Sequence, residues 1–371
     1  MNIAQISACY KPIVGGQEVY IDNLTKILRS YNYNVKIYQP YRGVKSEELV
    51  TIIRIPYLGR VIYDLDSYIL NLFLFLTKRK ILAREQIFIV HYAFYSLPVW
   101  SFKDKVIIVS HGIEWHTESM TLNDRIREMI AKVAFDRFSL VANDTHYLRH
   151  FGLSVEPGEG YFEEVAPKKW FIPNCVNLNV FKRNEGIEHL KKKKIILVPR
   201  QITPDRGVDL AIKAFNLFNQ QKEDFYLYII GKPTKGWYFE YCTNLAAKYG
   251  ISNKVIFNGF VENSAMPYYY SSALLTLIPT LRREGTSLSA LESMACGTPT
   301  VSTNVAGLRD LPTIQSDPNP TAIADKLIFA LENKVDIGRE QHDKAKRIFN
   351  LENWSKAWIR VIEAVSERGR C

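Results

Sequence analysis

Residues 283–299 read REGTSLSALESMACGTP, and they lie between the apolar runs LLTLIP at 274–279 and TVSTN at 300–304. This pattern predicts a strand, a loop, a helix and a second strand. Glu284 falls at the end of the first strand and Glu292 inside the helix. The two carboxylates could face hydroxyl groups, and the helix start between them favours an anion. This arrangement would suit a sugar nucleotide, which has hydroxyls at both ends and a diphosphate in the middle. Taken alone, two such glutamates are more often a capping acid and an exposed helix residue.

The rest of the chain repeats the alternation of short apolar strands with amphipathic helices, which is typical of parallel α/β sheets. In the first half the expected strands lie at 2–7, 34–40, 51–56, 87–92, 106–111 and 139–144, with a helix at 19–30. In the second half they lie at 194–200, 225–231, 254–260, 274–279 and 298–304, with helices at 208–219, 239–249 and 289–296.

A polar passage at 177–194 separates the two halves, and an amphipathic helix is expected at 349–365. We therefore expect two doubly wound domains at 1–180 and 190–350, followed by a terminal segment at 351–371.

Composition limits the class of protein. The longest apolar stretch, 68–76, is too short to cross a bilayer, and the first ten residues read as a buried strand rather than a leader. Five scattered cysteines fit a reducing environment, so we expect a cytoplasmic location. The net charge of +10 could attract nucleic acid, anionic lipid or phosphorylated substrates. The run Lys191–Lys194 reads as a solvated linker without a nucleic-acid-binding signature, which disfavours nucleic acid as a partner.

Several further motifs fall where strands are expected to end. Gly15 and Gly16 follow the first strand and precede a helix, where paired glycines can admit a phosphate or simply form a tight turn. Ser110-His111-Gly112 closes another strand, and Glu114 and His116 are close by as candidate acceptor contacts. Ligands of doubly wound sheets bind at the carboxyl ends of the strands, which makes these positions candidates for a site.

Taken together, the motifs resemble those of the family 4 retaining glycosyltransferases. The resemblance rests on the glutamates and Met-Ala-Cys-Gly-Thr-Pro of residues 284–299, with motifs in the same order at Gly15-Gly16, Ile172-Pro173-Asn174, Arg206-Gly207 and Asn258-Gly259-Phe260-Val261. It implies the α/β GT-B fold, in which two doubly wound Rossmann-like domains face each other across a cleft and the C-terminal helix crosses back to the first domain. It also implies an acceptor domain followed by a nucleotide-sugar donor domain.

The resemblance implies roles for individual residues. Glu284 would hold hydroxyls of the donor sugar and Glu292 the ribose. Backbone amides would contact the sugar and diphosphate, and they come from Gly285, Thr286, Ser287 and Leu288. Gly15 and Gly16 would approach the diphosphate, Val261 would lie near the base, and His111 would lie near the transferred sugar.

The chain departs from the family at two positions. The family places an arginine and, a few residues later, a lysine after the first strand of the second domain, where they neutralise the diphosphate leaving group. Here Gln201 falls at the arginine position, Arg200 lies one residue earlier, and Arg206 replaces the lysine. Adjacent side chains of a strand point to opposite faces, so Arg200 could serve only where a bulge or a shifted strand end re-aims it.

Two other stretches of the sequence have the composition of a functional site. Asp64-Leu65-Asp66 has the spacing of a metal-binding pair, but it opens a stretch that reads as helix, so we expect no metal site there. The aromatic stretch 61–76 is more often core than a groove for a lipid-like acceptor or a membrane.

The resulting expectation is an enzyme without a metal or other cofactor. It would move a sugar from a UDP- or GDP-sugar to a glycan or lipid-linked acceptor, with possible peripheral contact to an anionic membrane. Three alternatives stay open: an inert sugar-nucleotide-binding module, motivated by Gln201; an epimerase of the same fold; and a nucleic-acid-binding protein, supported only by charge.

Overall fold

The computed structural model describes residues 1–13, 15–40, 49–53, 82–115, 119–369 of the chain. The expected features at Asp64 and Asp66, at 61–76 and at His116 lie outside these residues. By their internal contacts, Met1–Val155, Gly160–Pro173 and Trp354–Cys371 form one compact unit, and Glu156–Glu159 and Asn174–Asn353 form a second.

In unit 1 the described strands form an eight-stranded sheet of order β3-β2-β1-β4-β5-β6-β8-β7. Only the pair of β7 and β8 is antiparallel among the pairings described. The strands are β1 (Asn2–Ile6), β2 (Asn34–Pro40), β3 (Val50–Ile53), β4 (Ile87–His91), β5 (Val106–Ser110), β6 (Ser139–Ala142), β7 (Glu163–Ala166) and β8 (Lys169–Phe171). The helical segments are α1 (Gly16–Ser30), η1 (Ala93–Lys105), α3 (Leu122–Arg137) and α4 (Thr145–His150).

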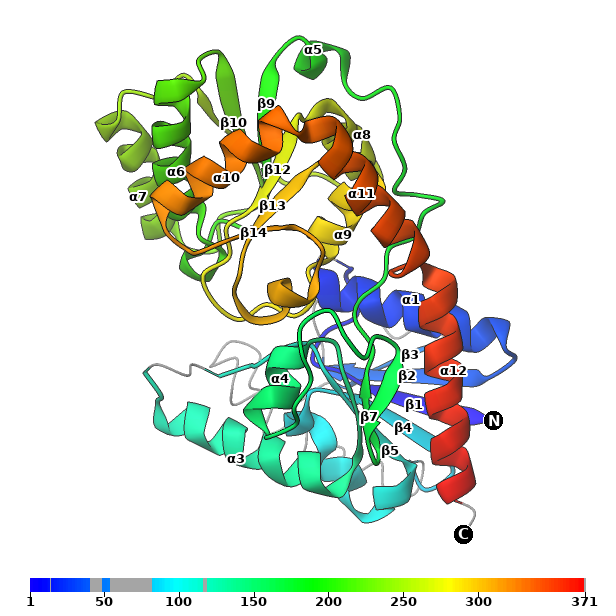
Figure 1. Ribbon diagram of the computed structural model, residues 1–371. Coiled ribbons are helices and arrows are strands. Elements are labelled where there is room, and N and C mark those ends of the chain that lie inside the picture. The colour runs from blue at the N-terminus through cyan, green and yellow to red at the C-terminus, as the bar shows by residue number, and fades with distance from the viewer. Residues whose placement is uncertain (14, 41–48, 54–81, 116–118, 370–371) are drawn as a thin grey trace. The chain divides into compact units, whose positions relative to one another are not determined.

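Helices lie on both sides of this sheet (Figure 1). Strands β4, β5 and β6 are buried along their whole length, as expected for central strands with both faces covered.

The last helix, α12 (Leu351–Arg368), joins unit 1 from Trp354 onward. The Trp358 indole Nε1 donates a hydrogen bond of 3.1 Å to the Tyr20 hydroxyl. The Arg360 guanidinium donates one of 2.7 Å to the Phe162 carbonyl. The far end of the sequence thus completes the first fold unit.

In unit 2 six parallel strands are described, in the order β11-β10-β9-β12-β13-β14. They are β9 (Lys194–Pro199), β10 (Phe225–Ile230), β11 (Val255–Gly259), β12 (Leu275–Ile278), β13 (Thr300–Thr303) and β14 (Ile314–Ser316). The helices are α5 (Glu188–Lys191), α6 (Val208–Gln221), α7 (Gly236–Lys248), α8 (Met266–Ser272), α9 (Leu288–Ala295), α10 (Pro320–Glu332) and α11 (Lys334–Arg347), with short 3-10 turns η2 (Pro204–Arg206), η3 (Asn263–Ala265) and η4 (Ala306–Asp310).

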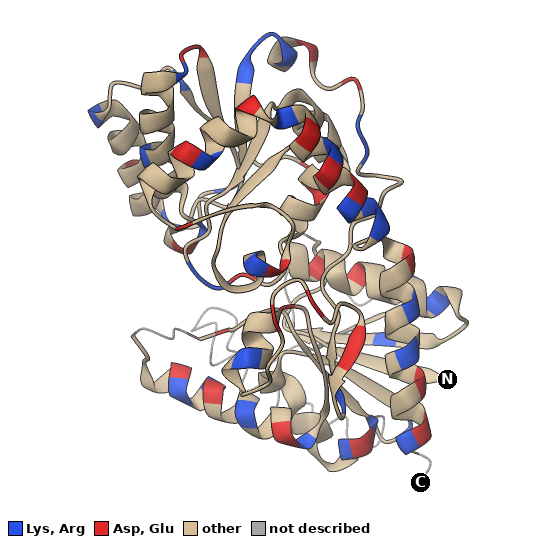
Figure 2. Cartoon of the chain, in the orientation of Figure 1, with Lys and Arg blue, Asp and Glu red and all other residues tan. Residues whose placement is uncertain are grey.

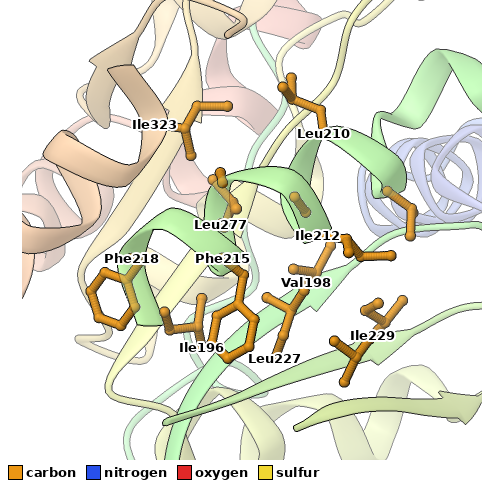
Figure 3. Packing of buried hydrophobic residues seen from close by; sticks show 14 of the residues in the cluster. Ile196, Val198, Leu210, Ile212, Phe215, Phe218, Leu227, Ile229, Leu277 and Ile323 are labelled. Atoms are coloured by element: carbon orange, nitrogen blue, oxygen red, sulfur yellow. The ribbon is translucent and has the colours of Figure 1, made fainter. Parts of the chain in front are cut away.

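The core of unit 2 forms where helix α6 packs on the sheet. Figure 3 shows Phe215 and Phe218 of α6 against side chains of β9 and β10, with Leu277 of β12 and Ile323 of α10 in the same cluster. Phe215 and Phe218 are fully buried. Burial of a large apolar side chain contributes about 1.5–3 kcal/mol relative to exposure, so this layer holds the helix to the strands that position the site.

Both units contain the strand order 3-2-1-4-5-6 of doubly wound sheets, which confirms the predicted fold class. The order reverses between β1 and β4 in unit 1, and between β9 and β12 in unit 2. Side chains just beyond these strand ends therefore lie where such folds bind ligands.

The chain passes from unit 1 to unit 2 between Pro173 and Asn174, a few residues before the expected boundary at 180. The reason is local, because Asn174 hydrogen-bonds to Thr286 and Val176 pairs with Asn350 within unit 2. Lys191–Lys194 are all exposed, as the solvated-linker interpretation predicts. Figure 2 shows basic and acidic residues interspersed along α3 and α11 rather than gathered by sign.

Candidate functional site

Arg200 is the first residue after β9, so its backbone no longer has to follow the extended conformation of the strand. The Arg200 amide donates a 3.0 Å hydrogen bond to the Val198 carbonyl, which closes a three-residue γ-turn and interrupts the alternation of side chains. Arg200 is consequently 7% exposed and faces the interior, whereas Gln201 is exposed. The structure thus brings Arg200, and not Gln201, into the cluster of candidate residues.

Glu284 is the centre of that cluster. Arg200 Nη2 lies 3.5 Å from Glu284 Oε1 and donates a 2.6 Å hydrogen bond to the Ser287 hydroxyl. Arg206 Nη1 pairs with the other carboxylate oxygen of Glu284. Two guanidinium groups lie beside one carboxylate, and guanidinium groups are suited to bind an anion such as a phosphate.

The loop after Glu284 is anchored by a residue from far along the chain. The Asn174 amide donates a 2.7 Å hydrogen bond to the Thr286 hydroxyl, and the Asn174 side chain donates to the Thr286 carbonyl. Helix α9 then starts at Leu288 with Ser287 as its N-cap. The first amides of a helix have no intrahelical acceptor, so this turn presents donors and the positive end of the helix dipole.

Glu292 lies on α9 and is 8% exposed. The Tyr270 hydroxyl donates a 3.0 Å hydrogen bond to Glu292 Oε2. Burial raises the pKa of Glu292 to about 7, although the Tyr270 hydrogen bond and the Arg200 charge act in the opposite direction. Burial also lowers the pKa of Arg200 to about 10. Because this value is still well above 7, the guanidinium stays charged at neutral pH.

Arg206 reaches Glu284 because of the glycine that follows it. Gly207 has φ +67°, and a Cβ atom there would overlap the Pro279 carbonyl oxygen. Glycine alone permits both the left-handed backbone and this close approach to the segment after β12. Asp205 pairs with Arg283 beside this contact, so η2 is tied to the loop that carries Glu284.

In unit 1, Gly15 and Gly16 form the start of α1, as expected. The Gly15 amide donates a 2.9 Å hydrogen bond to Glu18 Oε2. The Gly15 amide, which could bind a phosphate at this helix start, is thus already hydrogen-bonded to the Glu18 carboxylate. A phosphate would have to displace Glu18 from it.

His111 follows β5, and its Nε2 lies 3.1 Å from Nδ1 of His91, the last residue of β4, with the two rings nearly parallel. Burial lowers the pKa of His111 to about 3, so the imidazole is neutral at physiological pH. Burial raises the pKa of the nearby Glu114 to about 8, with the Arg127 charge acting in the opposite direction.

Val261 follows β11, the edge strand of the unit 2 sheet. Among the residues that the structure describes, no group of three or more His, Cys, Asp or Glu side chains could hold a metal ion. Over the same part of the chain, no helix combines the length and the hydropathy that a membrane span requires.

Sequence reasoning missed several residues that build the site. Tyr270 sits in a run of three tyrosines that reads as core, and His91 lies inside an apolar strand. Asn174 belongs to the Ile172-Pro173-Asn174 motif, and nothing in the sequence links it to Thr286. Its place just after the expected strands of the first domain was the one available signal.

Comparison with known proteins relates the chain to glycosyltransferases. Residues 181–348 match the protein family described as Glycosyl transferases group 1. An uncharacterized glycosyltransferase of Methanocaldococcus jannaschii is 31% identical over 131 residues, so that the match spans 35% of this chain and only 32% of that protein. A second uncharacterized glycosyltransferase of that organism is 21% identical over 368 residues, which cover 96% of each chain. The lipopolysaccharide 1,2-N-acetylglucosaminetransferase of Salmonella typhimurium is 22% identical over 291 residues, covering 74% of this chain and 76% of that protein.

Solved structures share the fold over almost the full length. The sucrose-phosphate synthase of Thermosynechococcus elongatus gives a TM-score of 0.79 at 17% identity, covering 98% of both chains. HepE of Anabaena, solved in complex with UDP-glucose, gives a TM-score of 0.72 at 15% identity, covering 99% of this chain and 100% of that chain. The chain therefore has the GT-B fold of glycosyltransferases, and its second unit carries the sequence pattern of group 1 within that class.

Proposed function

We propose that this protein is a retaining glycosyltransferase of family 4 that uses a UDP- or GDP-sugar as donor. The observation that carries the proposal is the cluster of Arg200, Glu284 and Arg206 at the N-terminal end of α9. A nucleotide diphosphate sugar combines hydroxyls at both ends with a diphosphate between them. Carboxylates can accept hydrogen bonds from the hydroxyls, and the arginine side chains can bind the diphosphate.

In the proposed reaction the bond between the anomeric carbon and the diphosphate breaks as the acceptor hydroxyl approaches the same face. Negative charge collects on the leaving diphosphate, where Arg200, Arg206 and the first amides of α9 stabilise it. Glu292 accepts hydrogen bonds from ribose hydroxyls. Glu284 accepts hydrogen bonds from sugar hydroxyls while it holds both arginines in place. The phosphate oxygen takes the proton of the acceptor, and the configuration is retained.

The acceptor is proposed to be a glycan or a lipid-linked sugar of cell-envelope or polysaccharide synthesis. The lipopolysaccharide enzyme among the relatives and the positive net charge support this choice. Action in the cytoplasm, at the inner face of a membrane and without a metal ion belongs to the same proposal.

Turnover tests the proposal with a matched pair of neighbours. Nucleoside diphosphate release and the anomeric configuration of the transferred or hydrolysed sugar are measured by NMR for the wild type, Arg200→Gln and Gln201→Ala. We expect retention, and a kcat for Arg200→Gln lower by about 10²–10³, the usual cost of removing one donor to a developing charge. Gln201→Ala should resemble the wild type because its side chain faces solvent. An inverted product, or full activity of a folded Arg200→Gln, would contradict the proposal.

The inert-module alternative was motivated by glutamine at the arginine position. Arg200 turns toward Glu284 and supplies a guanidinium there, which removes this motive. An epimerase would convert the donor without releasing the nucleoside diphosphate, and the same NMR spectra distinguish that outcome.

A further inference from the structure

A chain of buried hydrogen bonds runs beneath His111 in unit 1. The Thr25 hydroxyl donates to the Ile21 carbonyl at 2.7 Å, and Gln5 Nε2 donates to Thr25 Oγ1 at 2.8 Å. Gln5 Oε1 lies 2.9 Å from His91 Nε2. His91 Nδ1 lies 3.1 Å from His111 Nε2. Gln5 and His91 are fully buried and Thr25 nearly so, so water does not offer these groups alternative partners.

The direction of this chain is set at its first member. A backbone carbonyl can only accept, so the single hydroxyl hydrogen of Thr25 is committed to Ile21. Thr25 Oγ1 must then accept from Gln5, which fixes the amide with its nitrogen toward Thr25 and its oxygen toward His91. Because an amide oxygen only accepts, His91 Nε2 must carry the hydrogen of that ring.

The same reasoning passes to His111. A neutral His91 with its hydrogen on Nε2 has a lone pair on Nδ1, so His111 Nε2 must carry a hydrogen and donate it. His111 Nδ1 is then left with a lone pair. Within the part of the chain that the structure describes, His111 Nδ1 makes no hydrogen bond.

We propose that Thr25, Gln5 and His91 are positioning residues that hold His111 as the neutral tautomer with its hydrogen on Nε2. In this state Nδ1 accepts a hydrogen bond from a hydroxyl of the sugar substrate and repels a phosphate oxygen. The identification of the ligand as a sugar rests on the proposed function, whereas the tautomer follows from the hydrogen bonds together with the full burial of His91, which keeps that ring neutral. Through the His111 tautomer, the buried chain of Thr25, Gln5 and His91 makes this end of unit 1 bind a hydroxyl group in preference to a phosphate oxygen.

The surroundings keep both rings uncharged. Burial lowers the pKa of His91, and the neighbouring His111 lowers it further. The edges of Tyr20 and Tyr92 pack on the His111 ring, with ring centroids 4.8 Å and 5.1 Å from it. A doubly protonated His111 could still donate from Nε2 to His91 but would lose its acceptor at Nδ1, and burial of the ring disfavours this charged state.

The tautomer is measured directly on the full-length wild type, without any ligand. The protein is labelled with ¹⁵N-histidine, and two-bond ¹H–¹⁵N spectra distinguish a protonated from an unprotonated ring nitrogen. The chain has 7 histidines, and His111→Gln assigns the resonances of interest. We expect a protonated Nε2 and an unprotonated Nδ1 for His111 at pH 6 to 8. A hydrogen on Nδ1, or a doubly protonated ring in this range, would overturn the proposal.

A matched pair of variants tests the role of the buried chain. Thr25→Val keeps the shape but removes the hydroxyl that fixes the direction, so both tautomers of His111 should appear and kcat/KM for donor turnover should fall about tenfold. Thr25→Ser retains the hydroxyl and should restore a single tautomer and the rate. A single unchanged tautomer in a folded Thr25→Val, or mixed tautomers with an unchanged rate, would each refute the positioning role. If the wild type shows the expected tautomer but turns over no donor, the proposed function fails while the tautomer assignment stands.

Discussion

Glu292 is a carboxylic acid in a buried place, and its protonation links stability to pH. Its pKa is raised to about 7 in the folded chain, against an ordinary value of 4.5. Between these values the folded protein keeps a proton that the unfolded chain has released. The stabilising effect of that proton is fully present below about pH 4.5 and is lost as the pH rises through about 7.

This predicts that the free energy of unfolding of the wild type falls relative to that of Glu292→Gln as the pH rises from 5 to 7. The slope should be at most about 1.4 kcal/mol per pH unit, and the difference should level off above pH 7. Urea unfolding at half-unit pH steps measures it. A difference between the two proteins that is independent of pH would contradict the raised pKa.

At the residue scale the sequence predicts Glu284 and Glu292 from their spacing in a distinctive motif. The structure brings both close to Arg200, while their roles toward a ligand stay predictions. The orientation of Arg200 could not be predicted, because it depends on a single hydrogen bond to Val198 that ends the strand early. Tyr270 could not be assigned to Glu292, since the contact joins side chains of two successive helices and depends on how those helices pack.

At the scale of elements, the turn from β9 into α6 depends on Gly207. Its left-handed backbone and its contact with the Pro279 carbonyl both exclude a side chain. Gly250 has nearly the same backbone, with φ +70°, but no atom lies within 4 Å of the place where its Cβ would be. Comparing the same substitution at the two glycines therefore distinguishes the cost of the left-handed backbone from the cost of steric overlap.

We predict that Gly250→Ala costs about 1–2 kcal/mol of unfolding free energy, the cost of the left-handed conformation alone. Gly207→Ala should cost clearly more, because the Pro279 segment must also move. Since that segment leads to Glu284, the variant should also lose the pairing of Arg206. Denaturant unfolding of both variants measures the difference, and equal costs would show that the close contact with Pro279 has no energetic weight.

The elements that the sequence predicted best are the buried parallel strands and the amphipathic helices. Strand β9 begins at the predicted residue, and α6 begins at Val208 as expected. The hairpin of β7 and β8 and the strand β14 were not predicted. Each is only three or four residues long, too short to show a periodic pattern.

At the scale of the whole molecule, the two fold units follow from two rounds of the same alternation, and the sequence predicted both. Each unit, however, is made of segments that are not continuous in the sequence. Unit 1 includes the helix after Trp354, and the residues from Asn174 belong to unit 2 although the polar passage comes later. These assignments depend on the contacts of Trp358 and Asn174 with distant residues, which no local pattern reveals.

The central claim is that unit 2 binds a nucleotide sugar through the cluster around Glu284. The most direct test is a thermal-shift screen of the full chain against UDP-, GDP- and ADP-sugars and the free diphosphates, repeated with Arg206→Ala and with Gln201→Ala as control. A ligand at about 100 times its Kd adds about 2.7 kcal/mol of stability, which is readily seen as a higher Tm. We predict that one nucleotide class raises the Tm of the wild type and of Gln201→Ala, and that the rise is lost in Arg206→Ala. A folded wild-type protein that responds to none of these compounds would contradict the account.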